Sequence, residues 1–90
     1  MLKPIYPKVF RKELKLMGKR GWNLGKLREV MDMIVNEQPL PPERRNHPLH
    51  GKWEGALECH IQGDWVLAYE IDDAARKVTF HHTPAARTPA

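Results

Sequence analysis

Cysteine, long apolar runs and glycine-rich stretches are scarce in this 90-residue chain. Cys59 is the only cysteine, so a disulfide within the chain and a four-thiolate zinc site are both excluded. No apolar run is long enough to span a membrane, and the first residues lack the apolar core of a signal peptide. We therefore expect a protein that works in a reducing, cytoplasmic environment.

The chain is short and basic. Ninety residues bury too little surface to enclose a large cofactor, which excludes dinucleotide-binding and barrel-type enzymes. Of its fifteen Lys and Arg residues nine precede Glu29, together with only one of its eleven acidic residues. A basic surplus concentrated in the first third of the chain favours a polyanionic partner such as nucleic acid.

Helical spacing dominates this first third. Apolar residues between Phe10 and Met17 recur at i, i+4 and i+7, which predicts a basic amphipathic helix over residues 8–17. Asn23 is a favourable N-cap, and the apolar spacing after it predicts a second helix over residues 24–36. A short glycine-containing turn between the two predicts an antiparallel helix hairpin.

After residue 52 the apolar period changes to two, which is typical of half-buried strands. The segments that this reading defines are an edge strand at residues 2–6, a proline-rich loop at 38–51, and an antiparallel meander of strands at 53–61, 65–71 and 77–81.

These elements predict one α+β domain over residues 1–82, with two N-terminal helices packed on one face of a small antiparallel sheet. Residues 83–90 carry no strand pattern and are expected to fray. The helices leave the other sheet face open, and Glu58 and His60 point toward it. A ligand is expected to lie on that face.

Reactive side chains are densest between Arg44 and Trp65. Histidine titrates near neutrality, so two imidazoles, or an imidazole and a carboxylate, suffice as the acid and base of RNA cleavage. The plainer interpretation makes the loop histidines surface residues, Arg44 and Arg45 part of a solvated loop, and the tryptophans part of the core. From composition alone the plainer interpretation is favoured.

A zinc site is a weaker hypothesis. His47 and His50 form a His-x-x-His pair, and Cys59 adjoins His60. Adjacent strand residues point to opposite faces, however, so Cys59 and His60 do not easily reach one ion. We expect no metal, and stoichiometric zinc in the purified protein would overturn that expectation.

A family resemblance spans about residues 5–80. Residues 46–55 read Asn-His-Pro-Leu-His-Gly-Lys-Trp-Glu-Gly, followed by Glu-Cys-His-Ile at 58–61 and Asp-Trp-Val-Leu-Ala-Tyr at 64–69. This pattern resembles the central signature of YafQ-like toxins in the RelE superfamily. The resemblance implies a microbial ribonuclease-type fold in which helices back a curved sheet that accepts messenger RNA on its concave face.

The resemblance also implies an activity. Such toxins belong to type II toxin–antitoxin systems and cut mRNA in the ribosomal A site. They do so as endoribonucleases by metal-free acid–base catalysis with 2′-hydroxyl attack. The implied partners are a cognate antitoxin in a hetero-oligomer, mRNA and ribosomal RNA, and neither a cofactor nor a membrane is expected.

Carried over position by position, the resemblance makes His47, His60 and Asp64 catalytic, with His60 the best candidate for proton transfer. After the last strand, family members normally carry a phosphate-binding arginine and a further catalytic histidine; here His82 takes the arginine's place, and the later histidine is missing. Either His82, which is then a fourth catalytic residue, and Arg87 substitute in part, or that portion of the site is lost. The expected RNA-binding residues are Arg44, Arg45, His50, Lys52, Trp65 and Arg87.

Two other functions stay open at this point. A catalytically weakened or inactive toxin homologue would keep antitoxin or ribosome binding without cleavage, as the altered C-terminal residues favour. A general RNA-binding protein would instead use the cations of the first helix, and its affinity for free RNA would fall steeply with salt.

Overall fold

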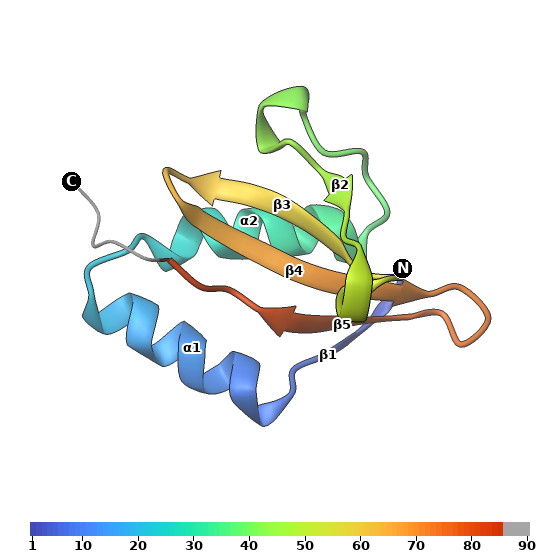
Figure 1. Cartoon of the computed structure of the whole chain (residues 1–90), viewed down its shortest axis with the longest axis horizontal. Helices are drawn as coiled ribbons and strands as arrows, with labels where there is room; N and C mark the ends of the chain where they lie inside the picture. Colours follow the sequence, from blue (N-terminus) through green and yellow to red (C-terminus); the bar gives the residue numbers. More distant parts are fainter. Residues whose placement is uncertain (86–90) are drawn as a thin grey trace.

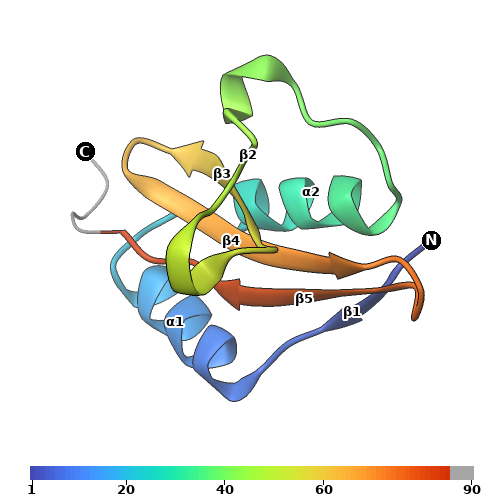
Figure 2. The ribbon, with the colours of Figure 1, turned by 45° about the vertical axis from the view of Figure 1, so that its right-hand side comes forward.

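A computed structural model describes residues 1–85. In this part of the chain two helices cover one face of a five-stranded sheet with the order β1-β5-β4-β3-β2 (Figures 1 and 2), which confirms the α+β prediction. Neither helix is long and apolar enough to cross a bilayer. The elements are β1 (Lys3–Ile5), α1 (Lys8–Lys19), α2 (Leu24–Val35), β2 (His47–Pro48), β3 (Leu57–Gln62), β4 (Trp65–Asp72) and β5 (Lys77–His82), with 3-10 turns η1 (Pro42–Arg44) and η2 (Gly51–Trp53).

The two helices form where the apolar spacing predicts them. Phe10 and Met17 are buried on α1, and the Asn23 side chain caps α2 by accepting a hydrogen bond from the Gly25 amide at 2.9 Å. In Figure 1 the helices run in opposite directions, α2 behind the sheet and α1 below it beside β5, as the short connection between them requires. The inner sheet face and both helices therefore enclose one apolar core, which contains Phe10, Trp65 and Phe80.

The sheet is larger than the predicted meander. Strands β3, β4 and β5 are antiparallel as expected, and β1 forms the expected edge strand. β1 runs parallel to β5, with Lys3 opposite Lys77, so the sheet is mixed. β2 lies inside the segment expected to be a loop, and it pairs with β3 so that His47 is opposite Glu58.

The first predicted strand begins later than the alternation suggested. Residues 53–56 are not part of a strand: Trp53 ends η2, and Gly55 adopts a φ of 97°, which interrupts the strand conformation. β3 therefore starts at Leu57, and the prediction of a strand beginning at residue 53 is wrong for its first four residues. Trp53 is 37% exposed and lies on the outer sheet face.

The outer face is only partly open, because η2 crosses in front of it (Figures 1 and 2). The Trp53 ring packs against His81 and His82, with ring centroids 5.7 and 5.0 Å apart. Beneath this region Ala68 is 6% exposed, although it points away from the helices. The open part of the outer face is thus the side occupied by β2 and β3.

The first residues after β5 are held in place. Thr83 is fully buried; its hydroxyl donates to the Val66 carbonyl at 3.0 Å, and its own carbonyl accepts from the Trp65 indole at 3.2 Å. The Val66 amide donates to the Pro84 carbonyl at 3.1 Å. Residues 83 and 84 are therefore hydrogen-bonded to β4, and the rest of the segment that was expected to fray, residues 86–90 with Arg87, lies outside the described residues.

Candidate active site

Two histidines and a carboxylate meet on the open part of the outer face. The His47 and His60 ring centroids are 6.3 Å apart, and His47 Nε2 lies 3.5 Å from Glu58 Oε1. His47 comes from β2 and the other two from β3. The structure thus brings together the two histidines that the family resemblance makes catalytic, and it adds Glu58 beside His47.

The alternation of β3 places Glu58 and His60 on this face. Cys59 and Ile61 are buried against the helices, so their neighbours point the other way. Burial raises the pKa of the Cys59 thiol to about 12, which keeps it protonated and excludes it as a nucleophile. Only the outward residues of β3 are therefore available for chemistry.

The segment leading into β2 is anchored from the opposite side of the sheet. The buried Tyr69 hydroxyl donates to Asn46 Oδ1 at 2.7 Å, and burial raises the pKa of this phenol to about 12. One residue later, His47 pairs with β3. This contact ties the start of β2, the strand that carries His47, to β4.

The second ring nitrogen of His47 is also engaged. Its Nδ1 lies 2.7 Å from the carbonyl oxygen of Arg45. A carbonyl oxygen can only accept a hydrogen bond, so Nδ1 carries a proton and Nε2 faces Glu58. Both ring nitrogens of His47 therefore lie near acceptor oxygens, Nδ1 near the Arg45 carbonyl and Nε2 near Glu58.

A polar hollow of about 330 Å³ lies beside His60. Arg44 lines this hollow, and its Nη1 donates a hydrogen bond to the Ile61 carbonyl at 2.6 Å, which orders the guanidinium beside β3. Two arginines next to an imidazole form a suitable environment for a phosphate group. The lining residues are Glu43, Arg44, Arg45, His60, Ile61, Gln62 and Gly63.

Asp64 sits in the turn between β3 and β4, directly after two residues that line this hollow. The turn is tight, since Gly63 adopts a φ of 57°. Asp64 is exposed at the end of β3 that also carries His60. Its placement is compatible with the expected role near His60.

Trp65 occupies a different environment from the one expected. It has no exposed surface, its ring packs 5.1 Å from that of Trp22, and its indole nitrogen donates to Thr83. A fully buried ring offers no face on which a nucleobase can stack. In this structure Trp65 is part of the core beneath the site.

His82 lies apart from the histidine pair. It is opposite Ala68 on β4, which is itself opposite Glu58 on β3, so β4 separates His82 from Glu58. His82 Nδ1 lies 3.0 Å from Glu13 Oε1 of α1, and its ring edge meets Trp53. His82 shares the outer face with the cluster but contacts a different set of residues.

Two of the expected RNA-binding residues, His50 and Lys52, are exposed beside and within η2. The sequence placed Glu58 beside His60 on the open strand face but assigned it no role in the site, because its contact with His47 depends on the pairing of β2 with β3. No group of three His, Cys, Asp or Glu side chains in residues 1–85 is arranged to hold a metal ion.

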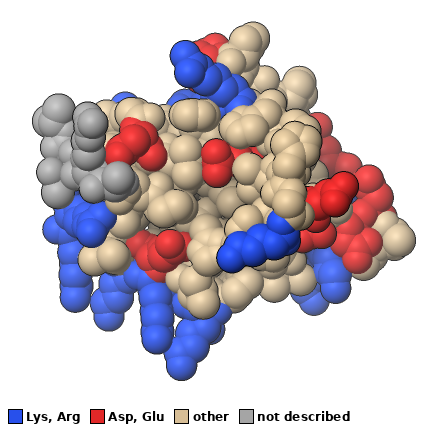
Figure 3. All heavy atoms as spheres, viewed as in Figure 1, with Lys and Arg blue, Asp and Glu red and all other residues tan. Residues whose placement is uncertain are grey.

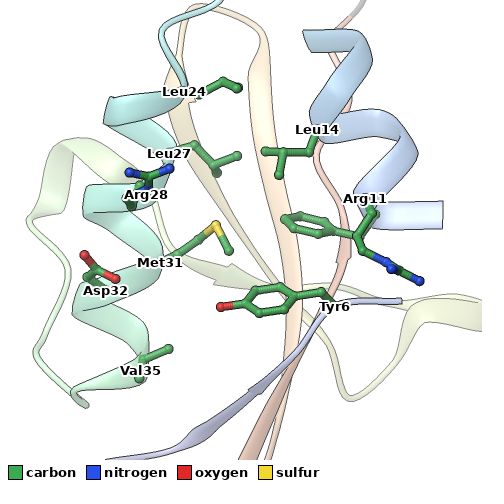
Figure 4. Close-up of a pocket in the computed structure, with 10 residues that line it drawn as sticks. Tyr6, Arg11, Leu14, Leu24, Leu27, Arg28, Met31, Asp32 and Val35 are labelled. Atoms are coloured by element: carbon green, nitrogen blue, oxygen red, sulfur yellow. The ribbon is translucent and has the colours of Figure 1, made fainter. Parts of the chain in front are cut away.

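A second concave surface lies on the opposite side of the molecule. A groove of about 430 Å³ separates α1 from α2, and Figure 4 shows Leu14 facing Leu27 and Met31 across it. Arg11 and Arg28 are among its lining residues, together with Tyr6, Phe10, Leu24, Asp32 and Val35. This groove is mostly apolar, whereas the hollow beside His60 is mostly polar.

Comparison with known proteins gives consistent results. Residues 2–85 match the family described as bacterial toxin of type II toxin-antitoxin system, YafQ. The chain is 36% identical over 69 residues to mRNA interferase toxin YafQ of Escherichia coli strain K12, covering 76% of this chain and 75% of that protein.

Solved structures agree over nearly the whole chain. The E. coli DinJ–YafQ complex contains a chain that is 31% identical, with a TM-score of 0.86 and coverage of 94% and 93% of the two chains. A copper-bound mutant toxin from Helicobacter pylori is 30% identical, with a TM-score of 0.88 and coverage of 96% of both chains. On this evidence, the chain belongs to the YafQ family of type II toxin–antitoxin toxins.

Proposed function

We propose that this chain cleaves mRNA on the ribosome by metal-free acid–base catalysis at His47, Glu58 and His60. The observation that carries this proposal is the pair of imidazoles, 6.3 Å apart between ring centroids, beside an arginine-lined hollow on an open sheet face. The E. coli relative is an mRNA interferase. Acid–base cleavage of RNA requires a proton acceptor, a proton donor and cations near the phosphate, and this surface offers all three.

The contacts of the two rings suggest their roles. His60 accepts the proton of the 2′-hydroxyl as its oxygen attacks the phosphorus. The bond from phosphorus to the 5′-oxygen breaks, and His47 gives the proton from Nε2 to that oxygen. The products are a 2′,3′-cyclic phosphate and a 5′-hydroxyl, while Arg44 and Arg45 balance the charge on the phosphate and Asp64 orients His60.

Helix α1 supplies the outer contact with ribosomal RNA. Figure 3 shows lysine and arginine side chains gathered along the edge of the outer face where α1 lies. The exposed cations of this helix are Lys8, Arg11, Lys12, Lys15 and Lys19. Contacts of this kind position a protein on nucleic acid without reading its sequence. They therefore suit a cytoplasmic toxin that binds the ribosome whatever mRNA is being translated.

A cognate antitoxin holds the toxin inactive in this proposal. The apolar groove between α1 and α2 suits an amphipathic antitoxin segment, whose acidic residues would meet Arg11 and Arg28 at the groove. The E. coli relative is known in complex with DinJ. Substituting Met31 with Glu, at the groove and away from the histidine pair, should weaken antitoxin binding more than mRNA cleavage.

Induced expression in bacteria tests the proposal. The wild-type chain should arrest growth and leave mRNA cut at translated codons. His60→Ala and His47→Ala should each lower cleavage about 10²- to 10⁴-fold, the usual contribution of a general acid or base. His81→Ala is the matched control, because His81 contacts Glu70 and Trp53 and stands outside the cluster.

Loss of growth arrest in both His47→Ala and His60→Ala, with His81→Ala still toxic, supports cleavage at this cluster. Equal toxicity of all four proteins contradicts it. Each variant should be checked for folding by circular dichroism and by its urea midpoint.

One set of observations favours the second candidate, a homologue that binds antitoxin or ribosome without cutting. His82 is held by Glu13 and Trp53, and Trp65 lies in the core, so neither offers a reactive surface beside His60. This candidate predicts that the chain copurifies with its antitoxin and sediments with ribosomes while mRNA stays intact.

A further inference from the structure

Arg45 has a backbone conformation that arginine rarely adopts. Its φ and ψ angles are 49° and 46°, in the left-handed region, where a Cβ atom crowds the backbone. It follows η1 directly, and its amide donates to the Pro42 carbonyl at 3.0 Å, closing that turn. Residues with strained backbones of this kind cluster at functional sites.

The conformation directs the Arg45 carbonyl at the active-site ring. That oxygen lies 2.7 Å from His47 Nδ1, only two residues along the chain. The other ring nitrogen, Nε2, lies 3.5 Å from Glu58 on β3. The His47 ring is therefore held at both nitrogens, on one side by backbone and on the other by a carboxylate.

We propose that Arg45 is a positioning residue that acts through its backbone: its left-handed turn fixes the tautomer and orientation of His47. The consequence for catalysis rests on the proposed function, whereas the consequence for the ring itself does not. A proton fixed on Nδ1 by the carbonyl leaves Nε2 as the nitrogen that faces substrate and Glu58.

The side chain of Arg45 has a different role from its backbone carbonyl. It lines the hollow beside His60, while its carbonyl faces His47. Substitutions can therefore distinguish the two contributions, because glycine and asparagine tolerate the left-handed region and a β-branched residue does not.

The test compares four variants. Arg45→Gly and Arg45→Asn remove the guanidinium and keep the left-handed turn. Arg45→Val removes the guanidinium and disfavours the turn. Arg45→Lys keeps a positive charge and has the same backbone preference as arginine. Two readouts are needed: the nitrogen shifts of the His47 ring in long-range ¹H–¹⁵N NMR spectra, and cleavage of mRNA on purified ribosomes.

We expect the ring spectra of Arg45→Gly and Arg45→Asn to keep the proton on Nδ1, as in the wild type, and that of Arg45→Val to show a changed proton distribution. Cleavage by Arg45→Val should be about tenfold slower than by Arg45→Gly, although both lack the guanidinium. Thermal melts establish that Arg45→Val is folded under the assay conditions.

Identical ring spectra and equal cleavage rates for Arg45→Gly and Arg45→Val would overturn the inference. Failure of the proposed function would look different. In that case the His47→Ala variant cleaves mRNA as fast as the wild type, or neither the wild type nor any variant cleaves it. In that case the NMR comparison still decides whether Arg45 positions the ring.

Discussion

At the scale of single residues, Glu58 shows how the site is built from a strand. It faces outward because Cys59 is buried, and the pairing of β2 with β3 puts His47 directly opposite it. The resulting contact, 3.5 Å between His47 Nε2 and Glu58 Oε1, is partly exposed and so is screened by solvent. Its value lies in orienting the ring rather than in stabilising the fold.

Replacing Glu58 with Gln should therefore slow cleavage with little change in stability. An interaction of about 1 kcal/mol that is present in the transition state corresponds to about fivefold in rate. Single-turnover cleavage on ribosomes measures the effect, and urea denaturation measures stability. A rate equal to wild type would show that Glu58 does not act on His47.

Substitution of Trp65, in contrast, should change stability. Because the ring is fully buried against Trp22 and its indole donates to Thr83, Trp65→Ala should lower the free energy of unfolding by about 3–5 kcal/mol. Trp65→Phe should cost less, since it keeps most of the apolar volume. Urea denaturation of both variants checks this. A Trp65→Phe protein with wild-type stability and no cleavage would instead favour direct contact with RNA.

At the scale of elements, the end of β5 is joined to α1 through one carboxylate. Glu13 Oε1 accepts from the Thr83 amide at 3.1 Å and lies 3.0 Å from His82 Nδ1. An irregularity in the β4–β5 pairing leaves His81 without an opposite residue and places His82 opposite Ala68. Residues 82–85 therefore close the core on this side.

Glu13→Ala should lower the free energy of unfolding by about 1–3 kcal/mol, because it leaves the buried Thr83 amide without its acceptor. Glu13→Gln keeps an oxygen at this position and should lose less. Urea denaturation and hydrogen exchange at the Thr83 amide report the two effects. Equal stability of wild type and Glu13→Ala would show that this contact does not hold the end of β5.

Periodicity predicted the long elements because each buries one continuous face. The helices and the β3–β5 meander all repeat apolar residues at the spacing that their geometry requires. β2 was not predicted, because a strand of only two residues, His47 and Pro48, is too short to show a period. It is a strand only through its pairing with β3. Trp53 was misplaced because its alternation with Leu57 continued through Gly55, where the chain turns.

For the site, the sequence indicated which residues take part but not how they are arranged, because the arrangement depends on contacts between distant residues. His47 and His60 were identified from a family pattern, but their closeness depends on the pairing of β2, which no local signal shows. The burial of Trp65 depends on Trp22 and Thr83, residues 43 positions before and 18 after it in the chain. Contacts over such separations are set by the fold.

At the scale of the whole molecule, two buried acids link stability to pH. Burial raises the pKa of Cys59 from 9.0 to about 12 and that of Tyr69 from 10.0 to about 12. Above pH 9 the unfolded chain releases these protons while the folded chain still holds them. Unfolding is then favoured by rising pH, and stability falls between about pH 9 and pH 12.

The slope of unfolding free energy against pH in this window should become shallower in Cys59→Ala and in Tyr69→Phe. Below pH 8 both groups are protonated in either state, so they should contribute no slope there. Urea denaturation across the range gives the slopes. If neither variant changed the slope above pH 9, the two acids would not be responsible for the alkaline loss.

The distribution of charge matches the two kinds of contact proposed for the molecule. Five of the nine basic residues of the first third lie on α1, outside the histidine pair, where the proposal places a broad contact with RNA. The proposed chemistry is placed on β2 and β3, where acidic and basic groups are mixed.

The central claim is that the His47–Glu58–His60 cluster cuts mRNA, and the most direct measurement is cleavage of a defined mRNA on purified ribosomes with analysis of the new 3′ ends. We predict cuts by the wild-type chain that leave a 2′,3′-cyclic phosphate, and rates about 10²- to 10⁴-fold lower for His60→Ala. Intact mRNA in the presence of folded, ribosome-bound wild-type protein, or unchanged cleavage by His60→Ala, would contradict the claim.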